Sequence, residues 1–195
     1  MKLFIAGENQ RIRLVAEGDE DAFRSLIHEY YPLAYNLACR MLNNRQDAEE
    51  VVQDAFFKIR GAVDSFRGES SLKTWILRIV MRLSLNRRRD RSRSSWNRLG
   101  LHWGMANAEE GTPDTQWVQQ SPEEDLISRE TGRRVLALID ELPDPLRQAL
   151  VLNSMDQLSY EEIGRILQVP LGTVSSRIYA ARNKLSKKLR EQDLL

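Results

Sequence analysis

Apolar residues recur three and four positions apart along most of the chain, which is the period of an amphipathic α-helix. In the first half, this period predicts two helices separated near Pro32, because proline disrupts a helix interior. It also predicts a helix over 47–60 and another over about 72–89. The apolar faces of these helices require a common core, so we expect a small helical domain.

The last forty residues show the pattern of a helix-turn-helix, over 158–189. Ser159 and Glu162 are spaced as a capping box, in which each side chain bonds the other residue's backbone amide. Gly172 is expected to supply the turn, and Thr173 to cap the second helix.

The second helix of this pair has a cationic face. Six lysines and arginines and no acidic residue lie between Thr173 and Arg190. A helix with short polar residues at its start and a basic body suits the major groove, with its first side chains at base edges and the rest near phosphates. The pattern therefore favours DNA binding over the alternative, a solvated basic helix on an ordinary bundle.

A second basic stripe follows the polar loop 66–71, which we expect at the surface. From Ile76 to Arg98 there are eight arginines and one acidic residue, Asp90. Such a segment would release counterions on meeting nucleic acid, so its binding should weaken steeply with salt. The alternative is a solvated basic helix end.

The helix over 47–60 has an acidic face that carries Asp47, Glu50 and Asp54. Three carboxylates at this spacing could indicate catalysis or a metal site, but no histidine, cysteine or glycine-rich phosphate loop accompanies them. The remaining interpretations are a solvated face and a face that docks on another protein.

Residues 92–128 lose the helical period and accumulate Gly, Pro, Ser, Asn and Gln, which is typical of a linker. Its second half is acidic, and Trp96, Trp103 and Trp117 suggest that it docks on a surface. We therefore predict an N-terminal domain over 1–91, a flexible linker, and a four-helix C-terminal domain over 129–195.

Composition narrows the class of protein further. The chain has 29 basic and 28 acidic residues, so its cationic segments are local rather than general. A single cysteine, Cys39, excludes an internal disulfide and is expected to pack as a small apolar residue; the two histidines provide no metal-ligand spacing. No long apolar run or signal peptide is evident, which predicts a cytoplasmic protein. No metal or cofactor is expected.

With these features in place, the chain resembles a bacterial RNA polymerase sigma factor of the extracytoplasmic-function (ECF) group. The resemblance rests on three segments in that family's order and spacing: DAEEVVQDAFFKI (47–59), FRGESSLKTWI (66–76) and LSYEEIGRILQVPLGTVSSRIYAAR (158–182). It implies an all-α fold of two small helical domains, sigma region 2 and sigma region 4, and a function in promoter-specific initiation of transcription.

The resemblance also implies a role for particular residues. Core polymerase, through the coiled-coil clamp of its largest subunit, would be bound by Asp47, Glu50, Gln53 and Asp54. The minus-10 element, including a base turned out of the non-template strand, would be read by Phe66, Arg67, Gly68, Ser70, Lys73, Trp75, Arg78, Arg82 and Asn86. The minus-35 element would be read by Asn153, Gly172, Thr173, Ser175, Ser176, Arg177, Tyr179 and Arg182.

The partners implied are the beta and beta-prime subunits of core RNA polymerase, promoter DNA, and an anti-sigma factor of the kind that is often membrane-anchored. No small-molecule substrate or catalytic residue is implied. Two other hypotheses remain from the residues alone. One is an autonomous DNA-binding regulator, which would not need a single-strand reader; the other is a recombinase or nuclease using Asp47, Glu50 and Asp54.

Overall fold

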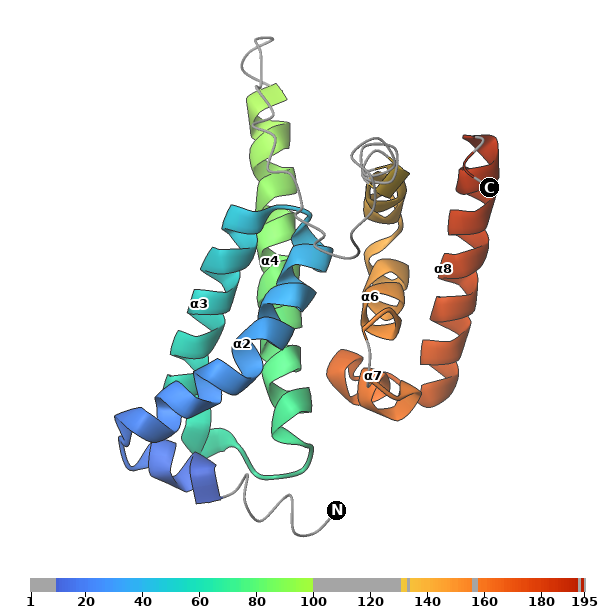
Figure 1. Ribbon diagram of the computed structural model, residues 1–195. Helices are drawn as coiled ribbons and strands as arrows, with labels where there is room; N and C mark the ends of the chain where they lie inside the picture. The colour runs from blue at the N-terminus through green and yellow to red at the C-terminus, as the bar shows by residue number, and fades with distance from the viewer. Residues whose placement is uncertain (1–9, 100–130, 133, 156–157, 193, 195) are drawn as a thin grey trace, which may run out of the picture. The chain divides into compact units, whose positions relative to one another are not determined.

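The computed structural model describes residues 10–99, 131–132, 134–155, 158–192 and 194, and within these it contains helices and no strand (Figure 1). The chain divides into two compact units, residues 1–110 and 111–195. The predicted all-α fold of two helical domains is confirmed. Most of the predicted linker, including Trp103 and Trp117, lies outside the described residues, as does the side chain of Trp96.

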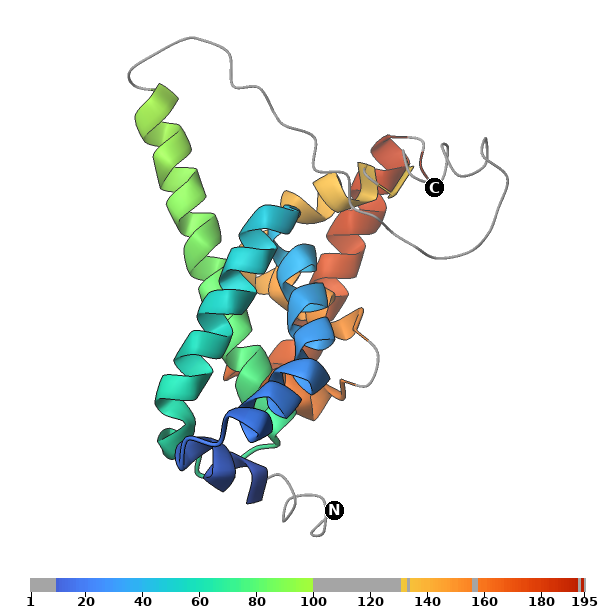
Figure 2. The same cartoon turned by 60° about the vertical axis from the view of Figure 1, so that its left-hand side comes forward.

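The first unit is a bundle of three long helices, α2 (Glu20–Leu42), α3 (Arg45–Ala62) and α4 (Leu72–Leu99), which pack against one another in both views (Figures 1 and 2). A short helix over 10–16 precedes them, and the 3-10 turn η1 (Val63–Ser65) ends α3. Between α2 and α3, Asn43 adopts the left-handed conformation, and the side chain of Asn44 accepts a 2.9 Å hydrogen bond from the amide of Asp47. Asparagine tolerates both positions, so this pair fixes a tight turn.

The core of this unit is formed by apolar residues spaced three and four positions apart on the inner faces of its helices. The fully buried ones include Leu26, Ala34, Leu37, Ala38, Met41, Ala48, Val52, Ala55, Ile59, Leu72, Leu77 and Val80.

The predicted interruption of α2 near Pro32 is wrong, because the helix runs through this residue without a break. A proline inside a helix removes one hydrogen bond and costs about 3 kcal/mol. Leu26 and Tyr30 before it and Ala34 and Leu37 after it are all buried, whereas Pro32 itself is exposed. Packing on both sides of the proline thus holds the two halves in one helix.

The helix α4 is longer than its apolar period indicated, since it extends to Leu99 rather than ending near Arg89. Arginine is a good helix former, so a run of arginines can continue a helix without an apolar stripe. Residues 90–93 are accordingly exposed.

The second unit contains a helix ending at residue 140, α6 (Asp144–Asn153), α7 (Tyr160–Leu167) and α8 (Leu171–Glu191). The capping box of Ser159 and Glu162 is present, with both reciprocal hydrogen bonds, and Pro145 lies in the first turn of α6. The predicted capping box is therefore confirmed.

A buried arginine connects α6 to the helix before it. The side chain of Arg147 is completely buried, and its guanidinium lies 2.8 Å from Asp144 and 3.6 Å from Asp140. Burying a charge is costly unless it is paired, and here two carboxylates provide the pairing.

The turn of the helix-turn-helix differs from the expectation. The helix α8 already begins at Leu171, so Gly172 and Thr173 lie in its first turn and Thr173 is not the capping residue. The left-handed residue that ends α7 is Gln168 (φ 56°), and Pro170 precedes α8. The glycine that allows the close approach in this turn is Gly164, because a Cβ there would lie only 3.0 Å from the Val169 carbonyl oxygen.

Candidate polymerase-binding and DNA-binding surfaces

The predicted docking residues divide into two pairs on α3. The Asp47 side chain is only 18% exposed, because Arg91 of α4 bonds it at 2.6 Å and Arg87 lies at 3.8 Å. Arg87 also forms an ion pair with Glu50. The other two predicted residues, Gln53 and Asp54, are exposed to solvent. The structure thus places Asp47 and Glu50 in contact with α4, and leaves Gln53 and Asp54 accessible to a partner.

Phe57 belongs to the same exposed face of α3 and was missed by the sequence analysis. Its side chain is 77% exposed, although its chain neighbour Phe56 is buried and stacks on Tyr31 at 6.3 Å. The apolar period assigns Phe56 to the core, and an adjacent phenylalanine carries no separate signal. A stricter test of the helical angle would have placed Phe57 beside Gln53 and Asp54, at spacings of four and three.

The predicted single-strand reader begins with a polar loop supported by two aromatic rings. Phe66 packs against Trp75 with ring centroids 5.4 Å apart and planes tilted by 58°. Ser71 caps α4, since its hydroxyl accepts a 3.2 Å hydrogen bond from the Thr74 amide. Gly68 adopts a positive φ of 69°, which glycine allows without strain. The half-buried rings hold the loop against the start of α4.

The other predicted minus-10 residues lie on this loop and on the following helix. Arg67, Arg82 and Asn86 are exposed, whereas Gly68, Ser70, Lys73 and Arg78 are half-buried. Arg78, Arg82 and Asn86 are spaced by four, so they form one stripe along α4. The structure brings the loop and this stripe together on one unit.

The predicted minus-35 residues occupy α8, with one exception at the end of α6. Val174, Ile178 and Ala181 are buried, and the residues between them face outward. Tyr179 is 69% exposed, and Ser175, Ser176, Arg182 and Gly172 are also exposed. Thr173, Arg177 and Asn153 are half-buried, and Asn153 is the last residue of α6. The Ser176 hydroxyl donates a 3.1 Å hydrogen bond to the Thr173 carbonyl oxygen, which leaves its lone pairs free to accept.

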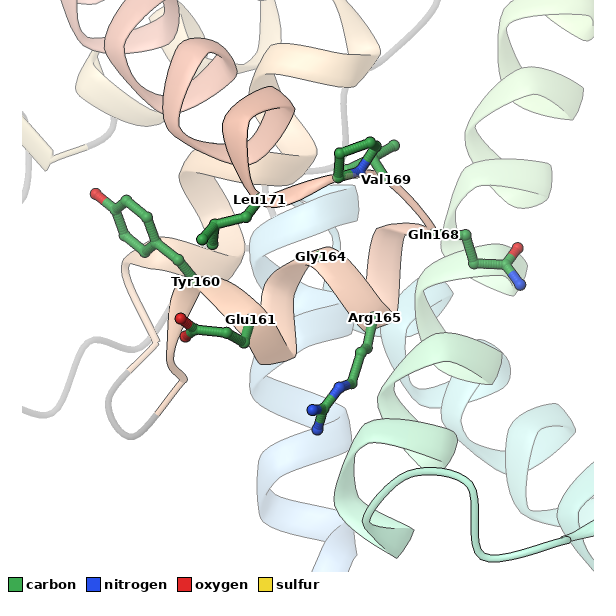
Figure 3. A pocket seen from close by; sticks show the side chains of 8 residues that line it. Tyr160, Glu161, Gly164, Arg165, Gln168, Val169 and Leu171 are labelled. Carbon is green, nitrogen blue, oxygen red and sulfur yellow. The ribbon is translucent and has the colours of Figure 1, made fainter.

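A shallow hollow of about 430 Å³ lies beside the start of α8 (Figure 3). It is lined by α7 and the turn, through Tyr160, Glu161, Gly164, Arg165, Gln168, Val169, Pro170 and Leu171. The side chains of Tyr160 and Leu171 are exposed apolar groups at its edge, and the sequence analysis did not single them out. Leu171 directly precedes the predicted minus-35 residue Gly172, and Tyr160 lies on α7, the helix before α8.

Cys39 is half-buried rather than fully packed as a small apolar residue. Burial raises the pKa of its thiol, and a hydrogen bond with Tyr35 opposes this effect. Burial and the same hydrogen bond raise the pKa of Tyr35 to about 12. Both groups are therefore neutral near pH 7 and give the first unit no reactive thiolate.

Among the residues that the structure describes, no group of three or more His, Cys, Asp or Glu side chains is placed to hold a metal ion. Within the same residues, no helix has both the length and the apolar character needed to cross a membrane.

Comparison with known proteins agrees with this arrangement of two units. Residues 26–94 match the family model of sigma-70 region 2, and residues 132–185 match that of sigma-70 region 4. The fold and its surfaces therefore define a sigma factor of RNA polymerase.

Individual relatives identify the group. The chain is 36% identical to the ECF RNA polymerase sigma factor SigW of Bacillus subtilis, over 93% of this chain and 96% of that protein. It is 34% identical to the ECF RNA polymerase sigma-E factor of Haemophilus influenzae, over 91% of this chain and 93% of the relative. The chain belongs to the ECF family of sigma factors.

Solved structures show the same fold at lower identity. CnrH, in complex with the cytosolic domain of CnrY, is similar with a TM-score of 0.65 and 21% identity, over 94% of this chain and 97% of that one. The sigma factor RpoE of Bartonella quintana, in complex with the anti-sigma factor NepR, gives a TM-score of 0.62 and 24% identity, over 86% and 96%.

Proposed function

We propose that this sigma factor binds core RNA polymerase through the exposed face of α3, reads the minus-10 element with the loop 66–71 and α4, and reads the minus-35 element with α8. The observation that carries the proposal is the placement of a basic, solvent-facing helix in each of the two units, α4 and α8. An autonomous regulator needs only one such helix. The second one suits a protein that also holds a separated strand.

The loop and α4 have the chemistry that a single-strand reader requires. Turning a base out of a duplex costs a few kcal/mol of stacking and pairing, which must be offset by stacking and hydrogen bonds in a pocket. Phe66 and Trp75 supply aromatic rings, and Arg82 and Asn86 supply exposed donors on the adjoining helix. We assign Gly68 and Ser70 to the loop that receives the base.

The start of α8 has the chemistry of a major-groove reader. The first amides of α8, which include that of Gly172, lack carbonyl partners in the preceding turn and favour phosphate. The Thr173 amide already donates a 2.9 Å hydrogen bond to the Pro170 carbonyl oxygen, so Thr173 would offer its hydroxyl instead. Further along, Ser175, Ser176 and Tyr179 face outward near the helix start, where base edges would lie. Asn153 of α6 and Arg182 would contact the DNA backbone on either side.

The partners follow from this assignment. We infer that the beta and beta-prime subunits of core polymerase and promoter DNA are bound directly, and that the protein acts in the cytoplasm without catalysing a reaction of its own. An anti-sigma factor is the expected inhibitor, since the similar sigma factor RpoE was solved in complex with the anti-sigma factor NepR.

The test is run-off transcription with purified bacterial core polymerase on a promoter library, with and without this protein. We expect specific starts only when the protein is added, and these starts yield both promoter elements. If core polymerase shows no association and the protein alone protects duplex DNA, the proposal fails and an autonomous regulator replaces it.

A further inference from the structure

Phe57 is the most exposed of the large apolar side chains within the described residues, at 77%. Burying a phenylalanine ring stabilises a folded protein, so its exposure leaves this stabilisation unused in the free protein. The ring cannot turn inward, because Phe56 and Ile59 on the same helix are buried and fix the rotation of α3. The exposure is therefore a consequence of the helix geometry rather than of a loose side chain.

The surroundings of Phe57 on α3 are polar and charged. Gln53 and Asp54 lie one turn before it on the same face, and both are exposed. Asp54 makes no ion pair with any described residue of the chain. The nearest cation along this face is Lys58, which is exposed and lies one turn after Asp54, but the described residues show no ion pair between the two. Arg60 is held elsewhere, since it pairs with Glu20 and lies over the Phe23 ring at 5.2 Å.

Two of the acidic residues near the start of α3 are already engaged by this chain. Arg87 and Arg91 of α4 pair with Asp47 and Glu50, so that end of the helix is partly neutralised. Of the three acidic residues among the predicted docking positions, Asp54 is the one not paired with α4, and it lies one turn before the exposed ring. A single aromatic ring bordered by polar groups is the arrangement of an interface hot spot, in which the rim excludes water from the centre.

We propose that Phe57 is the apolar anchor of the interface with core polymerase, and that the partner surface offers an apolar socket with a lysine or arginine opposite Asp54. This inference rests on the proposed docking of α3 on polymerase. It shifts the centre of that interface from Asp47 toward Phe57, because Asp47 is covered by its own arginines. Asp47 is then a positioning residue that holds α4 against α3.

The experiment measures the affinity of the full-length protein for purified core polymerase by fluorescence anisotropy. The variants are Phe57→Ala, Phe57→Leu and Asp54→Ala, and the matched control is Leu14→Ala, which truncates another exposed apolar side chain, in the helix over 10–16. Thermal unfolding of each variant checks the fold. We expect Phe57→Ala to weaken binding by about 30-fold or more, the effect of losing a hot-spot residue, while Phe57→Leu loses less and Leu14→Ala none.

Measuring the affinity at several salt concentrations distinguishes the charged contact of Asp54 from the apolar contact of Phe57. The loss caused by Asp54→Ala should shrink as salt rises, because exposed charges are screened, whereas the loss caused by Phe57→Ala should persist.

Each remaining outcome is decisive. If the wild-type protein does not bind core polymerase, the proposed function itself fails. If the wild type binds and Phe57→Ala binds equally well, the anchor is overturned and the function stands. If sedimentation shows that Phe57→Ala abolishes self-association and leaves the affinity for polymerase unchanged, the ring serves a second copy of this chain and the proposal is also overturned.

Discussion

The outward-facing residues of α8 differ in the chemistry that they offer to DNA. Arg177 carries a planar fork of donors that can bond a guanine edge, whereas Ser176 offers one hydroxyl that already donates to the Thr173 carbonyl. We therefore expect Arg177→Ala to cost about 1–3 kcal/mol of discrimination at the upstream promoter element, and Ser176→Ala to cost less. Competition binding of holoenzyme to promoters mutated at each element measures this. Equal losses at both elements would contradict the assignment of α8 to the upstream one.

The raised pKa of Cys39 has a direct consequence for its reactivity. The thiolate is the reactive form, and burial raises the pKa of the folded thiol above its unfolded value. At pH 8 the folded protein therefore holds less thiolate than the unfolded chain, and alkylation by iodoacetamide should be slower in buffer than in urea. The same shift means that the thiol contributes stability below its unfolded pKa and loses it as the pH rises through the folded pKa.

Removing the Tyr35 hydroxyl provides the check. Its hydrogen bond favours the thiolate, so Tyr35→Phe should slow alkylation of the folded protein further. Faster alkylation in that variant would show that access to solvent, rather than ionisation, controls the rate.

At this scale, the sequence predicts residues whose role depends on local spacing. Ser159 and Glu162 were identifiable as a capping box because the motif joins two residues only three positions apart along the chain. Phe57 and Arg147 were not identified, since one is a phenylalanine in solvent and the other an arginine in the core. The exposure of Phe57 follows from the rotation of α3, which the helical angle could have shown. The burial of Arg147 depends on Asp144 of its own helix and on Asp140 of the helix before it, and the packing of those two helices is not readable from the sequence.

At the scale of elements, ion pairs join α3 to the second half of α4 in the first unit. Asp47→Asn removes the ion pairs with Arg87 and Arg91 and keeps the side-chain volume. Because both arginines are partly exposed, we expect a cost of at most about 1 kcal/mol, which corresponds to roughly fivefold faster amide hydrogen exchange over residues 87–93.

Two companion variants separate the ion pair from other effects of Asp47. Arg91→Ala should accelerate exchange in the same residues while leaving the Asp47 carboxylate near the start of α3. Asp54→Asn should leave exchange in α4 unchanged. A uniform acceleration across all three helices would indicate general destabilisation and contradict the local role.

The types and order of the helices were predictable from the sequence, but three boundaries were not. Pro32 was read as a break because its local cost is large, yet the buried residues on both sides outweigh it. Gly172 was assigned to a turn that Gln168 makes instead, since asparagine and glycine are the usual left-handed residues and glutamine is not. The end of α4 was placed too early because arginine propensity, not apolar period, extends it. The proposed roles of the surface residues stay predictions.

For the whole molecule, the basic residues on both units predict a strongly salt-dependent complex with DNA. Each phosphate contact that is removed should reduce the slope of log affinity against log salt by about 0.9 on duplex DNA and about 0.7 on a single strand. Arg82 is exposed on α4, so Arg82→Ala in the holoenzyme should reduce the slope by about 0.7 if the residue contacts a strand phosphate. Promoter binding measured from 50 to 200 mM salt tests this. An unchanged slope, with altered preference at one base, would assign Arg82 to a base edge instead.

The alternation along α8 also bears on how such proteins diverge. Val174, Ile178 and Ala181 are buried and meet the requirements of folding, while Ser175, Ser176 and Tyr179 are exposed and are the residues proposed to meet the target DNA. Because the helical period keeps the two sets apart, a duplicated gene can acquire a new promoter preference without first losing a stable product. Each residue is rotated by about 100° from the one before it, so the residues that keep the fold and those free to change the target lie on different sides of α8.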